Sequence, residues 1–450
     1  MVLQQKDDVA IWGNDKPNTV VHIETDWGII DSTKSDNKGN WKIEIKTPIA
    51  SYKNYSINIS GSSTIALKNV LIGEVWFCSG QSNMEMTMRG YSNSPIRGSN
   101  EFILNSENKN IRLFKAKRQA SLNPLDNVVG DWNEATPSAV YNFSAVGYLF
   151  AKKMQKILQI PIGIISSSWG GTKIKGWSSK EALEKYDFIT FPTELPEKGK
   201  KERETPTLLY NGMIHPFLGY NIKGILWYQG ETDRFEYENY KELFPNMVNS
   251  WRREWNLEKE IPFYYVQIAP YDYATRDKTD KPNSALIREI QMQSLSKINN
   301  AGMVVTADVG DCENIHPSEK KTVATRLAYL ALKNNYGFTQ IGAQSPIYKE
   351  MKIVGEFIEI IFDDETAKSG NGLSSNQKEL SGFLIAGEDK IFHPATVIIT
   401  KDRTLKVFSE KVKFPIAVRY GFDNCFKASL FNTTNLPVSP FRTDQWEIKD

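Results

Sequence analysis

Residues 73–86 read GEVWFCSGQSNMEM. The apolar run Val75–Cys78 ends at Ser79-Gly80, and the polar residues Gln81, Ser82 and Asn83 follow directly. A short apolar run that ends in a glycine turn is typical of a buried strand. Some hydrolases keep a nucleophilic serine between a buried strand and the start of the next helix. The stretch therefore predicts Ser82 as a nucleophile, although a lone serine at such a place is more often a helix cap.

The chain around this stretch alternates between apolar runs and segments of helical periodicity. The apolar runs are Leu71–Cys78, Ile111–Phe114, Ile160–Ile165, Ile222–Tyr228, Phe263–Ile268 and Met303–Ala307. Helical spacing is found in Ser144–Leu158, in the segment after Pro245, and from Pro317, which fits a first helical turn, to Gly337. This alternation predicts an α/β fold with a mostly parallel, doubly wound sheet of flavodoxin-like type. Ligands of such sheets bind at the carboxyl ends of the strands.

Both ends of the chain have a different pattern. Residues 1–68 contain about seven short β-type runs separated by turn signals such as GNDKPN and SDNKGN. After about residue 343, runs such as FIEIIF and TVIIT restore the β character. The sequence therefore predicts three parts: an N-terminal β-sandwich at 1–68, an α/β catalytic domain at 69–342 and a C-terminal β-sandwich region at 343–450.

The composition gives no support to several classes of partner and binding site. With 55 basic and 53 acidic residues the net charge is +2, which gives no reason to expect nucleic acid or an anionic membrane as partner. No apolar stretch reaches the length of a membrane span. The three cysteines suggest neither a disulfide framework nor a zinc site, and we expect Cys78 to be a small buried apolar residue. Only four histidines are available as a catalytic base: His22, His215, His316 and His393.

Polar or glycine-rich segments follow four of the predicted strands, and together they predict one crevice. These segments contain Ser82, Gly170-Gly171, Gln229 and His316. A serine hydroxyl needs a base, for which imidazole is the usual choice, and a tetrahedral intermediate needs donors aimed at its oxyanion. Backbone N–H groups of Ser82 and Gly171 and the Gln229 amide could supply them. Each residue alone has a structural explanation, such as a cap, a turn or a buried hydrogen bond, and only their joint placement favours catalysis.

These segments also carry a family resemblance. GEVWFCSGQSNMEM, SSSWGGTKIKGW, WYQGETD and DVGDCENIHPSEK, with NVLIGE and SPFRTDQW, resemble the sialate O-acetylesterase family of SGNH-type serine esterases over almost the whole chain. The resemblance implies that Ser82 is the nucleophile, that His316 is the base, and that Ser82, Gly171 and Gln229 form the oxyanion hole. It also implies that neither a metal nor an organic cofactor is needed. Met84 replaces the second glycine of a GxSxG elbow, which disfavours the α/β-hydrolase family.

The sequence does not decide which residue is the third member of the catalytic triad. Many SGNH enzymes place an acid three residues before the histidine, and that position is Glu313 here. Asp311, Asp308 or a backbone carbonyl are the alternatives. We retain Glu313 as the predicted third member.

The substrate implied by the resemblance is an O-acetylated sialic acid, with acetylated xylan or another glycan as the alternative. Because sialic acid carries a carboxylate, we expect a cation near the crevice, and Lys173, Lys175 and Arg234 are the closest in sequence. A non-catalytic carbohydrate-binding protein and, more weakly, a lipase are the competing functions.

The start of the chain bears on localisation. MVLQQKDDVA lacks the apolar core of a signal peptide, but it resembles family sequence that normally lies inside the first domain. We therefore expect a missing leader and a periplasmic or extracellular protein, with a cytoplasmic one as the alternative.

Overall fold

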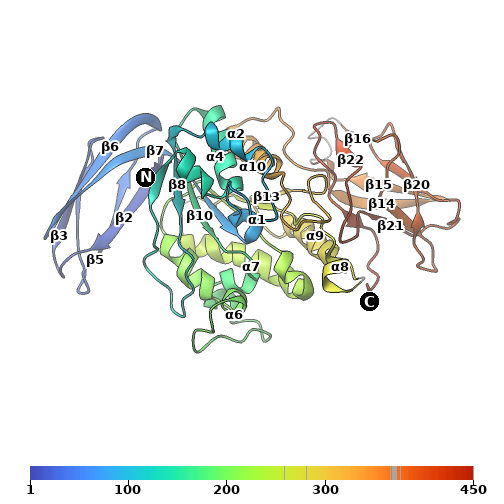
Figure 1. Cartoon of the computed structure of the whole chain (residues 1–450), viewed down its shortest axis with the longest axis horizontal. Helices are drawn as coiled ribbons and strands as arrows, with labels where there is room; N and C mark the ends of the chain where they lie inside the picture. Colours follow the sequence, from blue (N-terminus) through green and yellow to red (C-terminus); the bar gives the residue numbers. More distant parts are fainter. Residues whose placement is uncertain (258, 280, 365, 367–371, 376, 449–450) are drawn as a thin grey trace.

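The computed structural model describes residues 1–450 except 258, 280, 365, 367–371, 376 and 449–450. Figure 1 shows three parts in a row: N-terminal strands at one end, an α/β part in the middle and C-terminal strands at the other end. Among the described residues, no helix is long and apolar enough to cross a membrane.

The N-terminal part packs two sets of strands around an apolar core. Its strands are β1 (Val2–Gln4), β2 (Asp8–Asn14), β3 (Val20–Thr25), β4 (Ile30–Lys34), β5 (Asn40–Lys46), β6 (Ser51–Ser60) and the first half of β7 (Thr64–Gly80). β2 pairs with β5, while β3 pairs with β4 and β6. Alternate residues such as Ile11, Ile23, Ile43 and Ile57 point into the shared core, because successive side chains of a strand face opposite sides.

Strand β7 connects this part to the α/β part. Its first half pairs with β6 up to Ile72, and its second half pairs with β10 from Glu74 and with β11 from Trp76. The strand is therefore continuous across residue 68, where the sequence pattern changes. The two boundaries between the three parts stay predictions.

The middle part is built on a parallel sheet with one antiparallel edge strand. Besides β7 it contains β8 (Asn108–Lys115), β9 (Trp132–Ala135), β10 (Ile162–Ser168), β11 (Gly224–Tyr228), β12 (Phe263–Val266) and β13 (Ala301–Val304), in the order β13-β12-β11-β7-β10-β8-β9. All six apolar runs of the sequence form strands of this sheet. This order differs from the flavodoxin order at two pairings: β8 pairs with β10 rather than with β7, and β11 pairs with β7 rather than with β10. Apolar runs predict where strands lie along the chain, and they carry no information about which strand pairs with which.

Helices cover both faces of the sheet, as the alternating pattern predicts. The helices are α1 (Ser82–Glu85), α2 (Ser99–Leu104), α3 (Pro137–Tyr141), α4 (Ala145–Leu158), α5 (Lys180–Leu183), α6 (Lys200–Glu204), α7 (Tyr237–Trp255), α8 (Tyr273–Asp277), α9 (Asn283–Gln293) and α10 (Lys320–Tyr336). Short turns are η1 (Ile174–Trp177), η2 (Tyr210–Ile214), η3 (His215–Phe217), η4 (Glu231–Glu236) and η5 (Ser294–Ser296). α4 and α10 pack with Trp76 and Cys78 of β7 on one face, whereas α7 and α9 pack with Phe77 on the other.

Two helix boundaries differ from those that the sequence predicts. α7 begins at Tyr237, eight residues before Pro245, which lies inside the helix. α10 begins at Lys320, so Pro317 precedes it. By contrast, α4 covers the predicted segment Ser144–Leu158 with Ser144 as its N-cap, whose Oγ accepts a hydrogen bond from the Gly147 N–H at 3.1 Å.

The C-terminal part is composed of antiparallel strands around a separate core. Its strands are β14 (Tyr348–Val354), β15 (Phe357–Phe362), β16 (Leu373–Ser375), β17 (Phe383–Ala386), β18 (His393–Pro394), β19 (Thr396–Ile399), β20 (Leu405–Phe408), β21 (Ala417–Tyr420), β22 (Leu430–Asn432) and β23 (Phe441–Arg442). They form the sheets β14-β15-β20-β19 and β18-β17-β21-β23 and the pair β16-β22. Ile358, Ile385 and Val407 are among the core residues between them.

A disulfide ties the middle and C-terminal parts together. Cys312 bonds to Cys425, 113 residues later, while Cys78 is free and buried. The expectation of no disulfide was therefore wrong, because two cysteines so far apart in sequence give no spacing signal.

Removal of this disulfide is expected to lower stability markedly. A bridge that closes a loop of this length constrains the unfolded chain, so Cys312→Ser with Cys425→Ser should lower the free energy of unfolding by about 2–5 kcal/mol. Urea denaturation would measure the change, and the wild type under reducing conditions should match the double variant. Equal stability of the oxidised wild type and the double variant would contradict the expectation.

Candidate active site

The turn after β7 sets the position of Ser82. Gly80 has a φ of 133°, and a Cβ there would lie 2.2 Å from the carbonyl oxygen of Tyr228 on β11. A residue with a side chain therefore cannot replace it without moving the neighbouring strand. The same carbonyl accepts a hydrogen bond from the Gln81 N–H at 2.9 Å, and α1 begins at the next residue. The strand, turn and helix around Ser82 are as the sequence predicts.

A pocket of about 370 Å³ opens at this end of the sheet. Its lining residues are Gln81, Ser82, Tyr91, Arg118, Trp169, Gly170, Gly171, Arg203, Glu231, Thr232, Arg234, Arg276, Ile315 and His316. The structure thus brings together four residues that the sequence singles out: Ser82, Gly171, Arg234 and His316. Glu313, Gln229, Lys173 and Lys175 lie outside this lining.

The loop of Gly170 and Gly171 packs directly against the serine. A Cβ on Gly170 would lie 3.2 Å from the Cβ of Ser82, and the Gly170 N–H donates to Glu85 Oε2 at 2.9 Å. Gly171 has a φ of 71°, a conformation that favours glycine, and a Cβ there would meet Arg203. Among the described residues, no hydrogen-bond acceptor is found for the N–H of Ser82 or of Gly171. Both groups are therefore free to bind an oxyanion.

His316 lies across the pocket beside Tyr91. The two rings meet edge to face at 5.0 Å, and the Tyr91 hydroxyl donates to the Ser82 carbonyl oxygen at 3.2 Å. Burial, reinforced by the charges of Lys320 and Arg276, lowers the pKa of His316 to about 4. The imidazole is therefore neutral, and able to accept a proton, at any pH well above that value.

The backbone around His316 is held by side-chain amides. Asn314 Oδ1 accepts from the His316 N–H and from Ser94 Oγ, both at 2.9 Å. Asn83, the residue after the nucleophile, donates from Nδ2 to the Ile315 carbonyl oxygen at 3.1 Å. The disulfide at Cys312 lies four residues before the histidine. These contacts fix the position of the histidine relative to α1.

A buried polar cluster lies behind these residues. Asn83 Nδ2 also donates to Glu231 Oε1 at 2.6 Å, and Lys320 Nζ donates to Asn83 Oδ1. Burial raises the pKa of Glu231 and lowers the pKa of Lys320 to about 7. The cluster links the first helix, the QGETD segment and α10 at the base of the pocket.

None of the three acids considered as the third triad member hydrogen-bonds to the imidazole of His316. Glu313 is exposed, and its backbone N–H donates to the Asp311 carboxylate at 3.0 Å. Asp308 forms a two-pronged ion pair with Arg326, at 2.7 and 2.6 Å. In this arrangement the histidine is oriented by backbone and ring contacts.

Gln229 lies behind the glycine loop instead of in the pocket wall. Its Nε2 donates to the Thr172 carbonyl oxygen at 3.0 Å and also to Asp233 Oδ2. The side chain is fully buried. Both amide hydrogens are therefore used within the protein.

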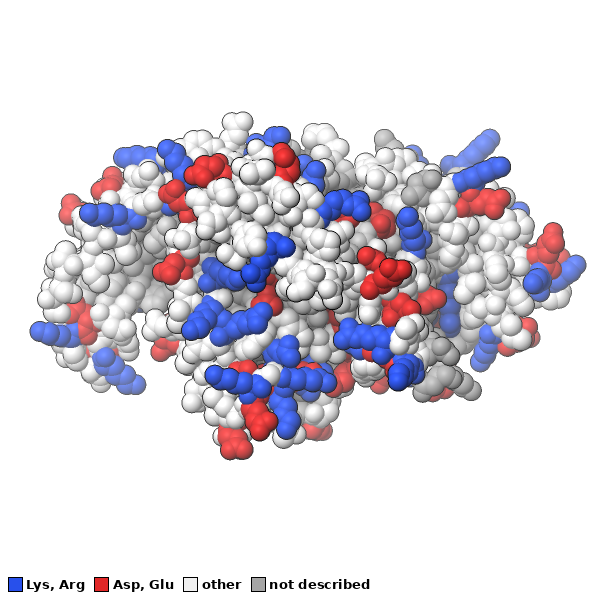
Figure 2. Space-filling view, viewed as in Figure 1, with Lys and Arg blue, Asp and Glu red and all other residues white. Residues whose placement is uncertain are grey.

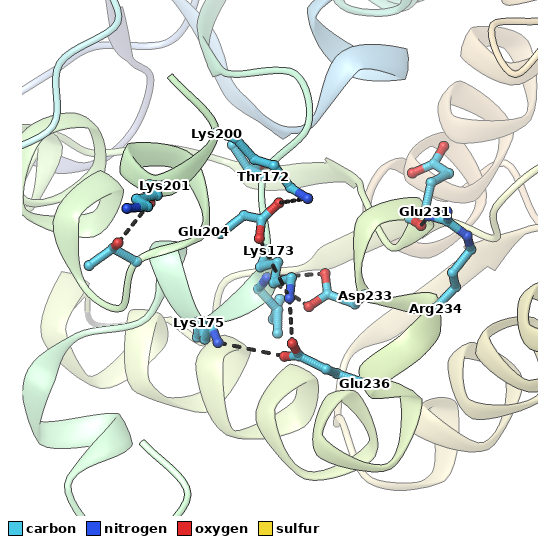
Figure 3. A network of polar contacts seen from close by, with 12 residues as sticks. Thr172, Lys173, Lys175, Lys200, Lys201, Glu204, Glu231, Asp233, Arg234 and Glu236 are labelled. Carbon is cyan, nitrogen blue, oxygen red and sulfur yellow. Dashed lines mark hydrogen bonds and ion pairs between the residues drawn. The ribbon is translucent and has the colours of Figure 1, made fainter. Parts of the chain in front are cut away.

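The three cationic residues that the sequence predicts near the crevice all form ion pairs with acidic side chains. Lys173 binds Glu236 and Glu204, and Lys175 binds Glu236 at 3.6 Å; Figure 3 shows both lysines turned toward these carboxylates. Arg234 lines the pocket, but its guanidinium forms a two-pronged pair with Asp277, at 2.5 and 2.6 Å.

Three other arginines of the pocket were missed: Arg118, Arg203 and Arg276. Arg118 pairs with Glu85 at 2.5 Å, whereas Arg203 and Arg276 have no carboxylate partner among the described residues. Figure 2 shows Lys and Arg side chains gathered over the α/β part, in the region where Figure 1 draws α1 and α6. No motif marks these arginines, because they come from three separate segments of the chain: Arg203 from α6, Arg276 from α8 and Arg118 from the segment after β8.

Comparison with known proteins gives consistent results. A sequence model of the family described as "Carbohydrate esterase, sialic acid-specific acetylesterase" matches residues 72–333. Sialate O-acetylesterases of rat and mouse are 30% and 28% identical to this chain over 67% and 81% of its length. The chain covers 64% of the rat protein and 77% of the mouse protein.

A solved structure extends the similarity to the whole fold. A carbohydrate acetylesterase from Xanthomonas citri is 33% identical, with a TM-score of 0.88 over 99% of this chain and 97% of its own. The resemblance of the four sequence segments is thereby confirmed. The chain belongs to the family of carbohydrate esterases described as sialic acid-specific acetylesterases.

Proposed function

We propose that the protein is a carbohydrate O-acetylesterase of SGNH type with Ser82 as nucleophile and His316 as base. The observation that carries the proposal is that Ser82, Gly171 and His316, from three separate strand ends, line one pocket. Unsatisfied N–H groups beside a serine, with a neutral imidazole in the same pocket, suit ester hydrolysis.

The reaction transfers the acetyl group twice, first from the sugar to Ser82 and then from Ser82 to water. Ser82 Oγ attacks the acetyl carbonyl while His316 takes the hydroxyl proton, and the N–H groups of Ser82 and Gly171 bind the oxyanion. His316 then gives the proton to the sugar oxygen as the C–O bond of the ester breaks. Water, activated by the same imidazole, releases acetate from the acetylated serine. No step requires a metal or an organic cofactor.

Covalent labelling tests this assignment. A fluorophosphonate probe should phosphonylate Ser82, and mass spectrometry of the digested protein would locate the adduct. Absence of an adduct at Ser82 would favour a non-catalytic carbohydrate-binding protein.

We further propose that the substrate is an O-acetylated sialic acid. The pocket is lined by four arginines, and two of them, Arg203 and Arg276, are not neutralised by a carboxylate among the described residues. Arg203 uses Nη1 and Nε to bind the carbonyl oxygens of Gly170 and Gly199, so Nη2 remains for a ligand. An arginine is the best partner for a carboxylate.

Neutralising these arginines should affect the anionic substrate most. Loss of a charge-assisted contact worth about 1.5–3 kcal/mol predicts that Arg203→Ala or Arg276→Ala lowers kcat/KM for 9-O-acetyl sialic acid by about 10- to 100-fold. Hydrolysis of 4-nitrophenyl acetate should change little in Arg276→Ala, and in Arg203→Ala it should fall less than sialate hydrolysis, because Arg203 also holds the Gly170 carbonyl. Steady-state kinetics on both substrates would measure the difference.

Arg253→Ala is the matched control, because Arg253 is more than half exposed and pairs with Glu181 outside the pocket. If the pocket variants and the control change both substrates equally, a neutral acetylated glycan such as acetylated xylan becomes the better proposal.

We also propose that the protein is exported. The Cys312–Cys425 disulfide supports this proposal, since disulfides persist in oxidising compartments. Fractionation of the native host, with detection of the protein in the periplasm or medium, tests it; recovery only from the cytoplasm would reject it.

A further inference from the structure

The carboxylate of Asp233 lies where two predicted parts of the oxyanion hole meet. Asp233 is on η4, two residues after Glu231 of the QGE segment, and only 2% of it is exposed. It accepts a hydrogen bond from Gln229 Nε2, and the Ile174 N–H lies 3.2 and 3.1 Å from its two oxygens. Figure 3 shows this carboxylate facing the strand of chain that carries Thr172 and Lys173.

Two contacts, here named the bracket, hold the segment that follows the glycine loop. Gln229 Nε2 binds the Thr172 carbonyl oxygen, and Asp233 binds the N–H of Ile174, two residues further on. Thr172 follows Gly171 directly, so the bracket anchors the chain on the C-terminal side of the residue whose N–H is proposed to bind the oxyanion. An oxyanion donor is effective only when it is held in place before the reaction.

We propose that ionised Asp233 is a positioning residue, which holds Gln229 and the loop of Gly171 in the geometry that binds the oxyanion. This inference rests on the proposed function, because it assigns Gly171 its place in the oxyanion hole. Gln229 then acts through the loop and does not touch the substrate.

The ionised form is the one that suits these contacts. A carboxylate can accept from both the amide and the backbone N–H, whereas a carboxylic acid loses part of its accepting capacity. Burial raises the pKa of Asp233 to about 7, although the hydrogen bonds from Gln229 and Ile174 and the charge of Lys173 oppose the shift. The bracket is therefore formed above about pH 7 and weakened below it.

The charged groups around Asp233 do not titrate in this range. Lys173 stays protonated, because its hydrogen bond and ion pair with Glu236 outweigh the effect of burial and raise its pKa. Glu236 stays ionised, since the same contact outweighs burial and lowers its pKa. Burial keeps Tyr240 neutral by raising its pKa far above 10. Glu231 and Arg234 point away from Asp233 in Figure 3.

The pH dependence of kcat/KM tests the proposal. Release of acetate from 4-nitrophenyl acetate should rise with pH in two steps, near 4 as His316 loses its proton and near 7 as Asp233 does. Asp233→Asn should lower kcat by about 10- to 100-fold at pH 8 with little change in KM, because a misplaced group costs up to about 10² in rate. The variant should also lose the step near pH 7.

Glu236→Gln is the matched control, because Glu236 lies on the same turn and binds Lys173 and Lys175 but neither Gln229 nor Ile174. It should keep the step near 7. A step that persists in Asp233→Asn would belong to another group, such as Lys320, and would overturn the proposal. A wild-type profile without a step between pH 6 and 8 would also overturn it, whether or not the variant folds.

These outcomes are distinct from failure of the proposed function. If Ser82 is not the nucleophile, the variant Ser82→Ala remains active and the fluorophosphonate probe forms no adduct at Ser82. If only the role of Asp233 is wrong, the serine assignment holds while the Asp233→Asn profile matches the wild type.

Discussion

Ser82→Ala is expected to lower kcat by about 10⁴–10⁶-fold while leaving the fold intact. The Ser82 hydroxyl makes no hydrogen bond to another described residue, and its side chain is partly exposed at the pocket. Its removal therefore deletes the attacking atom and no structural contact. Acetate release by the purified variant, with circular dichroism as a check on folding, would measure the effect.

Ser79→Ala is the matched control for this variant. Ser79 lies three residues earlier on β7, and its Oγ is fully buried and has no hydrogen-bond partner among the residues that the structure describes. Its removal should leave turnover close to that of the wild type. If Ser82→Ala kept more than about a tenth of wild-type turnover, Ser82 would not be the nucleophile.

The part of the site that the sequence predicts well is the part carried by regular structure. An apolar run such as Val75–Cys78 can be recognised as a strand because burial on both faces demands continuous apolar residues. Parallel strands end at the same edge, so Ser82, Gly171 and His316 could be expected to meet. Local sequence pattern and sheet geometry are sufficient to predict this meeting of side chains.

The sequence is less informative where the hydrogen-bond partners of a side chain decide its role. Gln229 follows a strand as expected, but its amide is bound by Thr172 and Asp233, and no sequence pattern indicates which way an amide points. Lys173 is close to Gly171 in sequence, yet Glu236 holds it outside the pocket wall. A residue's place in the chain thus predicts its neighbourhood better than its contacts.

The residues missed altogether come from short helices and loops outside the sheet. Arg203 reaches the pocket from α6, and Arg276 reaches it from α8. Cys312 and Cys425 are joined only because the C-terminal part packs beside the loop of His316. Such contacts depend on tertiary packing, which periodicity does not encode.

Among the described residues no carboxylate hydrogen-bonds to His316, and this has a consequence for the proposed catalysis. In triads the acid orients the imidazole and stabilises its cation, and its loss lowers kcat by up to about 10⁴-fold. Here the orientation comes from Tyr91, Asn314 and the backbone, and Glu313 is exposed. The low pKa of His316 agrees with a cation that has no acidic partner. The geometry thus favours a Ser–His dyad over the predicted triad with Glu313.

Two variants serve as controls for the role of His316. Glu313→Gln should keep most of the wild-type turnover, and a large loss would restore the triad. His22→Ala changes an exposed histidine on β3 of the N-terminal part and should have no effect on turnover.

His316→Ala is expected to lower kcat by about 10⁴–10⁶-fold, the same order as Ser82→Ala, because nucleophile and base act as a unit. Without the imidazole, neither the serine proton nor the proton needed by the leaving sugar oxygen can be transferred. The double variant Ser82→Ala/His316→Ala should therefore be no slower than either single variant, and the step of kcat/KM near pH 4 should be absent from the residual activity of His316→Ala. Steady-state rates of acetate release from pH 3.5 to 8 would measure both effects. Additive losses in the double variant would show that the two residues act independently, and a step near pH 4 that survives in His316→Ala would assign that ionisation to another group.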